Sequence, residues 1–285
     1  MKFATPQAFR QALEDRLRQE YPHHHIPRLR KMIAFERFMT RLNEDWVLKG
    51  GYALQLRTEQ ARTTQDIDLL AQPIVGTRIF ESLVQQLHKD VGDYFSFAIE
   101  PISSDVNLGG SIRFRVTSRV AGRVFERFHV DIGQGDVIVG PIDYLSPPQM
   151  LSFAEITSAP FPCYPVTQHI AEKLHALVKP RAVENSRLKD LVDILLLTGL
   201  DSLIQADRLR ASVEAVFDTR GDLLPTRLGQ LPLSWRMRFN RLTAELELPF
   251  ENLEQATDVV SLFIDPILAN VAAGVWNPQL WKWGE

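Results

Sequence analysis

The residues best suited to chemistry are two aspartates, Asp66 and Asp68, separated by a single isoleucine. The segment 63–71 reads as a β-strand, in which residues two apart point to the same side. We therefore expect both carboxylates on one face and Ile67 in the core. Paired carboxylates chelate divalent metals, and Mg²⁺ completes its octahedron with water and substrate phosphate. The pair predicts a site for two Mg²⁺ ions about 4 Å apart with a bound nucleoside triphosphate.

A third carboxylate, Asp131, lies on the second arm of a predicted β-hairpin, 111–132, whose turn is Ala121-Gly122. Strand alternation separates an inward set from an outward set on this arm: Phe128, Val130 and Ile132 against Arg127, His129 and Asp131. Asp131 is the candidate third metal ligand.

A glycine pair precedes the aspartates. Gly50 and Gly51 lie between a predicted strand, 46–48, and a predicted helix, 52–57. Without Cβ atoms the turn lets backbone N–H groups approach phosphate, and the helix N-terminus favours negative charge. A double glycine also occurs in ordinary tight turns, so the specific signal is the order strand, glycines, helix and acidic strand.

A second candidate cluster lies beyond a proline-rich stretch. Lys173, on a predicted helix at 166–179, precedes core-facing Leu174, so it is expected to flank the buried stripe at a domain cleft and to pair with a triphosphate. Asp193 lies on the next predicted helix, 186–198. The alternative is that Lys173 and Asp193 are solvated surface charges, with Asp193 in local pairs with Lys189 and Asp190. Arg181 and Arg187 are further candidates for holding phosphate or RNA.

Four sequence stretches resemble one family: LKGGYALQLR…TTQDIDLL, HVDIG, HIAEKLHAL and RLKDLVDILLL. They resemble the AbiEii/MenT nucleotidyltransferase toxins of the DNA polymerase β-like nucleotidyltransferase superfamily. The resemblance extends over most of the chain. It implies that Asp66 and Asp68 bind metal, that Asp131 is the third acidic position, and that Lys173 and Asp193 are catalytic.

The resemblance also implies a nucleotide site formed by Lys49, Gly50, Gly51, Tyr52, Lys173 and Arg187. Many members of the family have Ser or Thr after the glycines, where a hydroxyl reaches phosphate. This chain has Tyr52 instead, so phosphate binding is expected through backbone N–H groups.

The implied function is a toxin that transfers a nucleoside monophosphate from an NTP to an RNA acceptor, the 3′ end of tRNA, and that has a cognate antitoxin protein. The residues leave other acceptors open, such as a small molecule or a protein side chain. A degenerate NTP-binding module is the alternative outside enzymes, and Tyr52 is the reason to consider it.

The fold expected is α+β, a polymerase β-like nucleotidyltransferase core with a mixed sheet plus a C-terminal helical domain. Prolines between Gly140 and Pro165 place the junction there, giving domains at 1–164 and 165–285, the second helical throughout. No stretch approaches the roughly 20 apolar residues that cross a bilayer, so we expect a cytoplasmic protein without a membrane partner. Cys163 is the single cysteine, which excludes an intrachain disulfide.

The net charge of −3 excludes a generally basic protein, although basic residues crowd the N-terminal helices. They form either an RNA contact or ordinary solvated faces: Arg10, Arg16, Arg18, Arg28, Arg30, Lys31, Arg37 and Arg41. The run His23 to His25 is interpreted as a loop, and His129 and His175 as packing residues near the proposed site.

Overall fold

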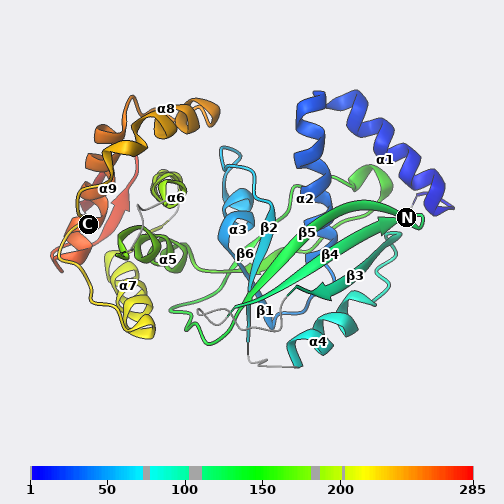
Figure 1. Ribbon diagram of the computed structural model, residues 1–285, viewed down its shortest axis with the longest axis horizontal. Helices are drawn as coiled ribbons and strands as arrows, with labels where there is room; N and C mark the ends of the chain where they lie inside the picture. The colour runs from blue at the N-terminus through cyan, green and yellow to red at the C-terminus, as the bar shows by residue number, and fades with distance from the viewer. Residues whose placement is uncertain (1, 73–77, 103–110, 181–186, 201–202, 285) are drawn as a thin grey trace. The chain divides into compact units, whose positions relative to one another are not determined.

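The computed structural model describes residues 2–72, 78–102, 111–180, 187–200 and 203–284 (Figure 1). They form two compact units, each assembled from separated stretches of chain. Unit 1 comprises Met1–Leu56, Thr63–Gly135 and Tyr144–Cys163, and unit 2 comprises Arg57–Arg62, Asp136–Asp143 and Tyr164–Glu285. The first is built on a mixed sheet and the second mainly on helices, as expected for an α+β protein.

The main sheet has the strand order β3-β4-β5-β2-β1-β7-β6. Three neighbouring pairs are antiparallel: β3 with β4, β4 with β5, and β1 with β2. Two are parallel: β2 with β5, and β1 with β7. The strand bounds are β1 Trp46–Lys49, β2 Asp66–Ala71, β3 Phe95–Pro101, β4 Ile112–Val120, β5 Arg123–Gly133, β6 Asp143–Leu145 and β7 Phe161–Cys163.

The predicted hairpin is confirmed, since β4 and β5 pair around Ala121-Gly122 and both residues have positive φ. Buried and accessible residues alternate along β5, with Phe128, Val130 and Ile132 buried. Strand β2 begins with the same alternation, so Ile67 is buried between two partly accessible aspartates. The proline-rich stretch pairs at one edge of the sheet, as the short strands β7 and β6. Its prolines restrict the strands' length.

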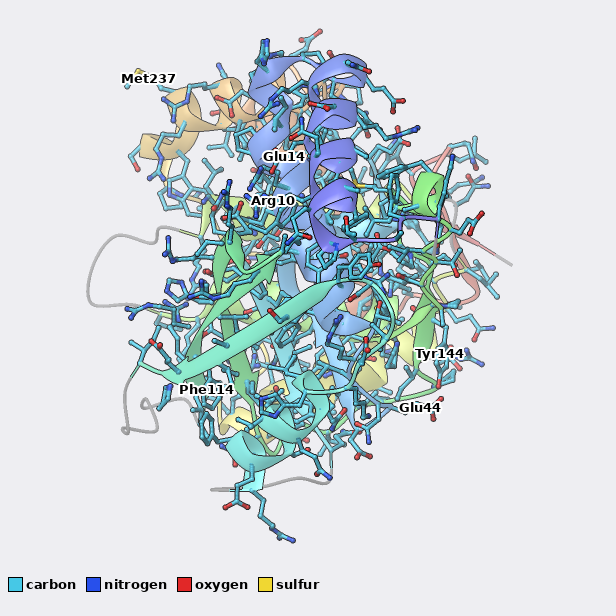
Figure 2. The ribbon with its side chains drawn as sticks, turned by 90° about the vertical axis from the view of Figure 1, so that its right-hand side faces the viewer. Arg10, Glu14, Glu44, Phe114, Tyr144 and Met237 are labelled. Carbon is cyan, nitrogen blue, oxygen red and sulfur yellow. The ribbon has the colours of Figure 1, made fainter. Side chains whose placement is uncertain are left out.

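Four α-helices accompany the sheet in the described part of unit 1: α1 Pro6–Glu20, α2 Ile26–Met39, α3 Gly50–Arg57 and α4 Arg78–Leu87. The run His23–His25, interpreted as a loop, forms a short 3₁₀ helix. Thr5 caps α1, because its hydroxyl accepts from the Ala8 N–H. Arg10 of α1 donates to carbonyls at the end of the β4–β5 hairpin, and Glu14 pairs with Arg30 of α2 (Figure 2). These bonds hold α1 against both the hairpin and α2.

Two N-terminal arginines are buried instead of exposed. Arg37 and Arg41 both bind Asp93, with nitrogen–oxygen distances of 2.6–2.9 Å, and Arg37 also donates to Ser158. The arginines outweigh the effect of burial and lower the pKa of Asp93. Arg37 and Arg41 are therefore core ion-pair residues, and the hypothesis that they contact RNA or solvent is wrong.

The α-helices in the described part of unit 2 are α5 Val166–Val178, α6 Leu188–Thr198, α7 Ala206–Arg220, α8 Arg236–Glu245 and α9 Leu253–Leu268. The expectation of helix to the C-terminus is wrong, because β8 Val275–Asn277 and β9 Lys282–Gly284 form a hairpin. Trp276 of β8 is buried and donates its indole N–H to the Thr198 carbonyl. No helix within the described ranges has the length and apolar character of a membrane span.

Candidate functional site

The glycine turn of unit 1 lies directly against one of the strand aspartates. Gly50 has a φ of +65°, and a Cβ added to it would lie 2.6 Å from Cγ and 2.8 Å from Cβ of Asp68. A Cβ on Gly51 would lie 2.7 Å from the Thr64 hydroxyl. Only glycine provides both the backbone angle and the close approach at position 50. The predicted proximity of the turn to a carboxylate is thus found for Asp68.

Sheet register explains why the acidic residues gather. Antiparallel β1 and β2 place Lys49 opposite Asp68, and parallel β2 and β5 place Asp68 beside Asp131. Two residues earlier on both strands, and so on the same sheet face, Asp66 pairs with His129. Side chains on paired residues of one sheet face project together, so three carboxylates from two strands share one surface of the sheet.

A cation already occupies this surface. Arg113 of β4 is the register partner of Asp131, and its Nε and Nη2 atoms lie 2.7 and 2.6 Å from the two carboxylate oxygens of Asp131. Its Nη2 atom is also 3.8 Å from Asp66. The hydrogen bonds to Asp131 raise the pKa of Arg113 further, with help from the charges of Asp66 and Asp68. Arg113 is not among the predicted site residues, because nothing in the local sequence distinguishes it from Arg115, two residues along the same strand.

His129 contacts the acidic pair, although it was assigned to packing. Its Nδ1 atom lies 3.2 Å from Oδ1 of Asp66, and 40% of its side chain is exposed. An imidazole in this position restrains the Asp66 carboxylate, and the tautomer decides whether Nδ1 donates to it.

Two of the three predicted metal ligands, Asp66 and Asp68, have the chemistry and placement that suit a divalent cation. Asp66 and Asp68 offer hard carboxylate oxygens on one strand face, as Mg²⁺ requires. Asp131 has both oxygens bound by Arg113. Within the described ranges, no group of three or more His, Cys, Asp or Glu side chains is arranged to hold a metal. A cation at Asp131 would therefore compete with Arg113 for these oxygens.

Unit 2 contains a buried ionic cluster around Asp193, whose side chain is 0% exposed. Nζ of Lys173 lies 2.7 Å from Asp193 and 2.9 Å from Asp190, and Arg62 donates to both Asp193 oxygens at 3.0 and 2.9 Å. The interpretation of Lys173 and Asp193 as solvated surface charges is wrong.

Charge outweighs burial in this cluster. Burial favours the neutral form of both groups. The cations Lys173 and Arg62 nevertheless lower the pKa of Asp193, and the carboxylates of Asp193 and Asp190 raise the pKa of Lys173. The two carboxylates therefore favour the charged ammonium form of the buried Lys173 side chain.

His169 lies beside the cluster and was missed by sequence reasoning. It is one helical turn before Lys173 on α5 and is 1% exposed, and neither ring nitrogen has a hydrogen-bond partner among the described residues. Burial, and then the charge of Lys173, lower its pKa to about 3, so the ring is neutral. The four-residue spacing in HIAEK was the available signal. Arg62 offered none, because its partner is remote in sequence.

The remaining predicted nucleotide-binding residues have different environments. Tyr52 is fully buried with its ring against Phe35, and its hydroxyl has no hydrogen-bond partner among the described residues. Arg187, immediately before α6, lies 3.6 Å from Asp190 and is 43% exposed. Lys49 ends β1 and is partly buried. Arg181 lies outside the described residues.

The family described as the nucleotidyl transferase AbiEii toxin of type IV toxin–antitoxin systems matches residues 37–270. The chain belongs to the AbiEii family. It is thus a nucleotidyltransferase by family, with an NTP as substrate and an antitoxin as partner.

Two solved structures share the fold found here. MenT4, a nucleotidyltransferase toxin from Mycobacterium tuberculosis H37Rv, is 15% identical, with a TM-score of 0.52 over 94% of this chain and 99% of that chain. JHP933 from Helicobacter pylori is 14% identical, with a TM-score of 0.51 over 86% of this chain and 93% of that chain. A search of curated protein sequences found no match. The predicted α+β nucleotidyltransferase fold is confirmed.

Proposed function

We propose that this AbiEii protein transfers a nucleoside monophosphate from an NTP to the 3′ end of a tRNA. The observation that carries the proposal is the packing of Gly50 against Asp68, which brings a glycine backbone turn directly against one of the two paired carboxylates. The RNA acceptor comes from the resemblance to MenT toxins.

The reaction is an in-line displacement at the α-phosphorus. An acceptor hydroxyl oxygen forms a new bond to phosphorus, the bond to the bridging oxygen of the β-phosphate breaks, and pyrophosphate leaves. The hydroxyl proton passes to a carboxylate or water. Asp66 and Asp68 would hold Mg²⁺, which supplies charge neutralisation on the attacking and leaving oxygens. Backbone N–H groups at Gly50 and Gly51 would bind the phosphates.

Lys173 and Asp193 are assigned a part in the same reaction. A buried ammonium that remains protonated, oriented by Asp193 and Asp190, is suited to stabilise negative charge on phosphate. A merely structural ion pair is the competing explanation. It predicts that activity returns whenever stability is restored.

Purified protein incubated with each labelled NTP and total tRNA, aminoglycosides or a protein extract tests the proposal. We expect label at the RNA 3′ end with Mg²⁺ present, and at least about a hundredfold loss in Asp66→Asn and Asp68→Asn, as removal of electrostatic stabilisation predicts. Asp90→Asn, which changes an exposed aspartate of unit 1, is the matched control. Label on protein or aminoglycoside and never on RNA would reject the tRNA acceptor.

A non-catalytic NTP-binding module is the second candidate, because Arg113 holds the third carboxylate and no three-ligand metal site is formed among the described residues. It predicts nucleotide binding that survives Asp66→Ala, together with no transfer by the unmodified protein. Equilibrium dialysis with labelled NTPs alongside the transfer assay separates the two candidates.

A further inference from the structure

The positively charged Arg113 side chain binds the Asp131 carboxylate, where a metal ion would otherwise bind. We propose that Arg113 occupies Asp131 in the free protein and is displaced onto the phosphates of the incoming nucleotide, so that metal and nucleotide bind cooperatively. This inference rests on the proposed function, since it concerns the same carboxylates.

The contact is specified by the fold. Arg113 and Asp131 are register partners on antiparallel strands, and the planar guanidinium binds both carboxylate oxygens. Such two-pronged pairing is stronger than a single hydrogen bond and is specific to arginine. Its further approach to Asp66 means that one guanidinium serves two predicted metal ligands.

The ion pair between Arg113 and Asp131 is broken by movement of the Arg113 side chain, not by loss of its proton. Arginine stays protonated in proteins, so no pH change discharges the pair. The side chain is 42% exposed and the Asp131 side chain 21%, so neither is locked into the core. Phosphate is the other anion whose geometry suits the arginine fork. A bound triphosphate therefore offers Arg113 a replacement partner.

This exchange has a thermodynamic consequence. A metal ion that binds Asp131 in the free protein must break two charge-assisted hydrogen bonds. When the metal binds together with the nucleotide, new bonds from Arg113 to the phosphates offset that free energy. By linkage, the nucleotide raises metal affinity by the same factor by which metal raises nucleotide affinity.

The first measurement is Mn²⁺ binding to nucleotide-free protein, followed by electron paramagnetic resonance. We expect Arg113→Gln to bind Mn²⁺ about tenfold more tightly than the unmodified protein, since it loses an interaction of roughly charge-assisted hydrogen-bond strength. Arg115→Gln is the matched control, because Arg115 is two residues along β4, on the same face and 53% exposed. Equal affinity in the Arg113 variant and the unmodified protein would overturn the proposal.

The second measurement is binding of inorganic tripolyphosphate without metal, by calorimetry. Arg113→Gln is expected to weaken it about tenfold while Arg115→Gln does not. A structural defect would not raise the affinity for Mn²⁺ and lower the affinity for tripolyphosphate in the same variant. Circular dichroism and thermal melting check separately that the variant is folded. An unchanged tripolyphosphate affinity would overturn the transfer of Arg113 to phosphate.

The transfer assay separates this inference from the proposed function. Unaltered Mn²⁺ affinity in Arg113→Gln, with active unmodified protein, would sink the role of Arg113 alone. Tighter Mn²⁺ binding in that variant, with no transfer by the unmodified protein to any acceptor, would sink the proposed function alone.

Discussion

Gly50 is where the backbone comes closest to the acidic pair. Its positive φ disfavours any other residue, and the space that a Cβ would need is filled by the Asp68 side chain. The second effect is the one that bears on chemistry, since Asp68 must rotate to admit the new atom.

Gly50→Ala is expected to lose transfer activity by at least about a hundredfold, the scale on which misplaced catalytic groups act. Gly92→Ala is the matched control, because Gly92 has a similar φ of +67° and nothing within 4 Å of the added Cβ. Both substitutions should lower stability by about 1–2 kcal/mol from backbone strain. Activity assays and urea unfolding of the two variants check this, and equal activity in both would contradict the role given to the Asp68 contact.

His169 gives unit 2 a specific pH response. Its pKa, lowered to about 3 by burial, is below the ordinary value of 6.5. As pH falls below 6.5 the unfolded chain takes up a proton that the folded protein excludes, so stability falls until about pH 3. The contribution is at most about 1.4 kcal/mol per pH unit.

His169→Leu is therefore expected to reduce the loss of stability between pH 6.5 and 4.5. Little should change at pH 7, because neither ring nitrogen has a partner among the described residues. Urea unfolding at several pH values measures the effect, with exposed His88→Leu as control. A His169→Leu variant with the unmodified pH slope would show that the ring is not buried as described.

The pairing of α5 with α6 combines apolar packing with the Lys173–Asp193 ion pair. Leu174 on α5 and the run from Leu191 to Leu197 on α6 are largely buried, so the charges lie in low-dielectric surroundings. Breaking one partner of such a pair leaves an uncompensated buried charge.

Asp193→Ala should destabilise the protein by about 3–5 kcal/mol, because Lys173 and Arg62 lose the carboxylate that compensates them in the interior. The double substitution Lys173→Met with Asp193→Leu should recover part of that loss, since it removes the buried ammonium but still takes Asp193 from Arg62. Thermal unfolding measures both. If the double variant also regains transfer activity, Lys173 and Asp193 have only a structural role.

The two units share the chain in a discontinuous way. Unit 2 takes Arg57–Arg62 and Asp136–Asp143 from the sequence that otherwise forms unit 1. Two of its ion pairs depend on these stretches, Arg62 with Asp193 and Arg57 with Asp143. A single cut at 164/165 removes Arg62 from Asp193.

A fragment of residues 165–285 is thus expected to unfold at a lower temperature and with less cooperativity than unit 2 in the full chain. Circular dichroism melts of the fragment and the full protein check this, with Arg62→Met in the full chain as a control for the lost ion pair. A fragment that melts cooperatively near the full protein's transition would show that the internal segments contribute little to unit 2.

Local periodicity predicted the elements that carry most of the candidate site. Alternation in QDIDLL and RFHVDIG places carboxylates opposite buried residues, because strand side chains change face at every residue. The helix at 166–179 and the glycine turn follow equally local rules. The C-terminal hairpin was missed, because it depends on the pairing of Trp276 with Trp283 across a turn, and the two three-residue strands are too short to show a period of their own.

The sequence determined which faces of the strands and helices carry charge, since that depends only on residue order and helical or strand period. It did not determine that Arg113 meets Asp131, that Arg62 meets Asp193, or that Asp93 takes Arg37 and Arg41 into the core. Those partners are far apart in the chain. Strand register and helix packing bring them together, and these arise from the sum of many contacts that no local pattern encodes.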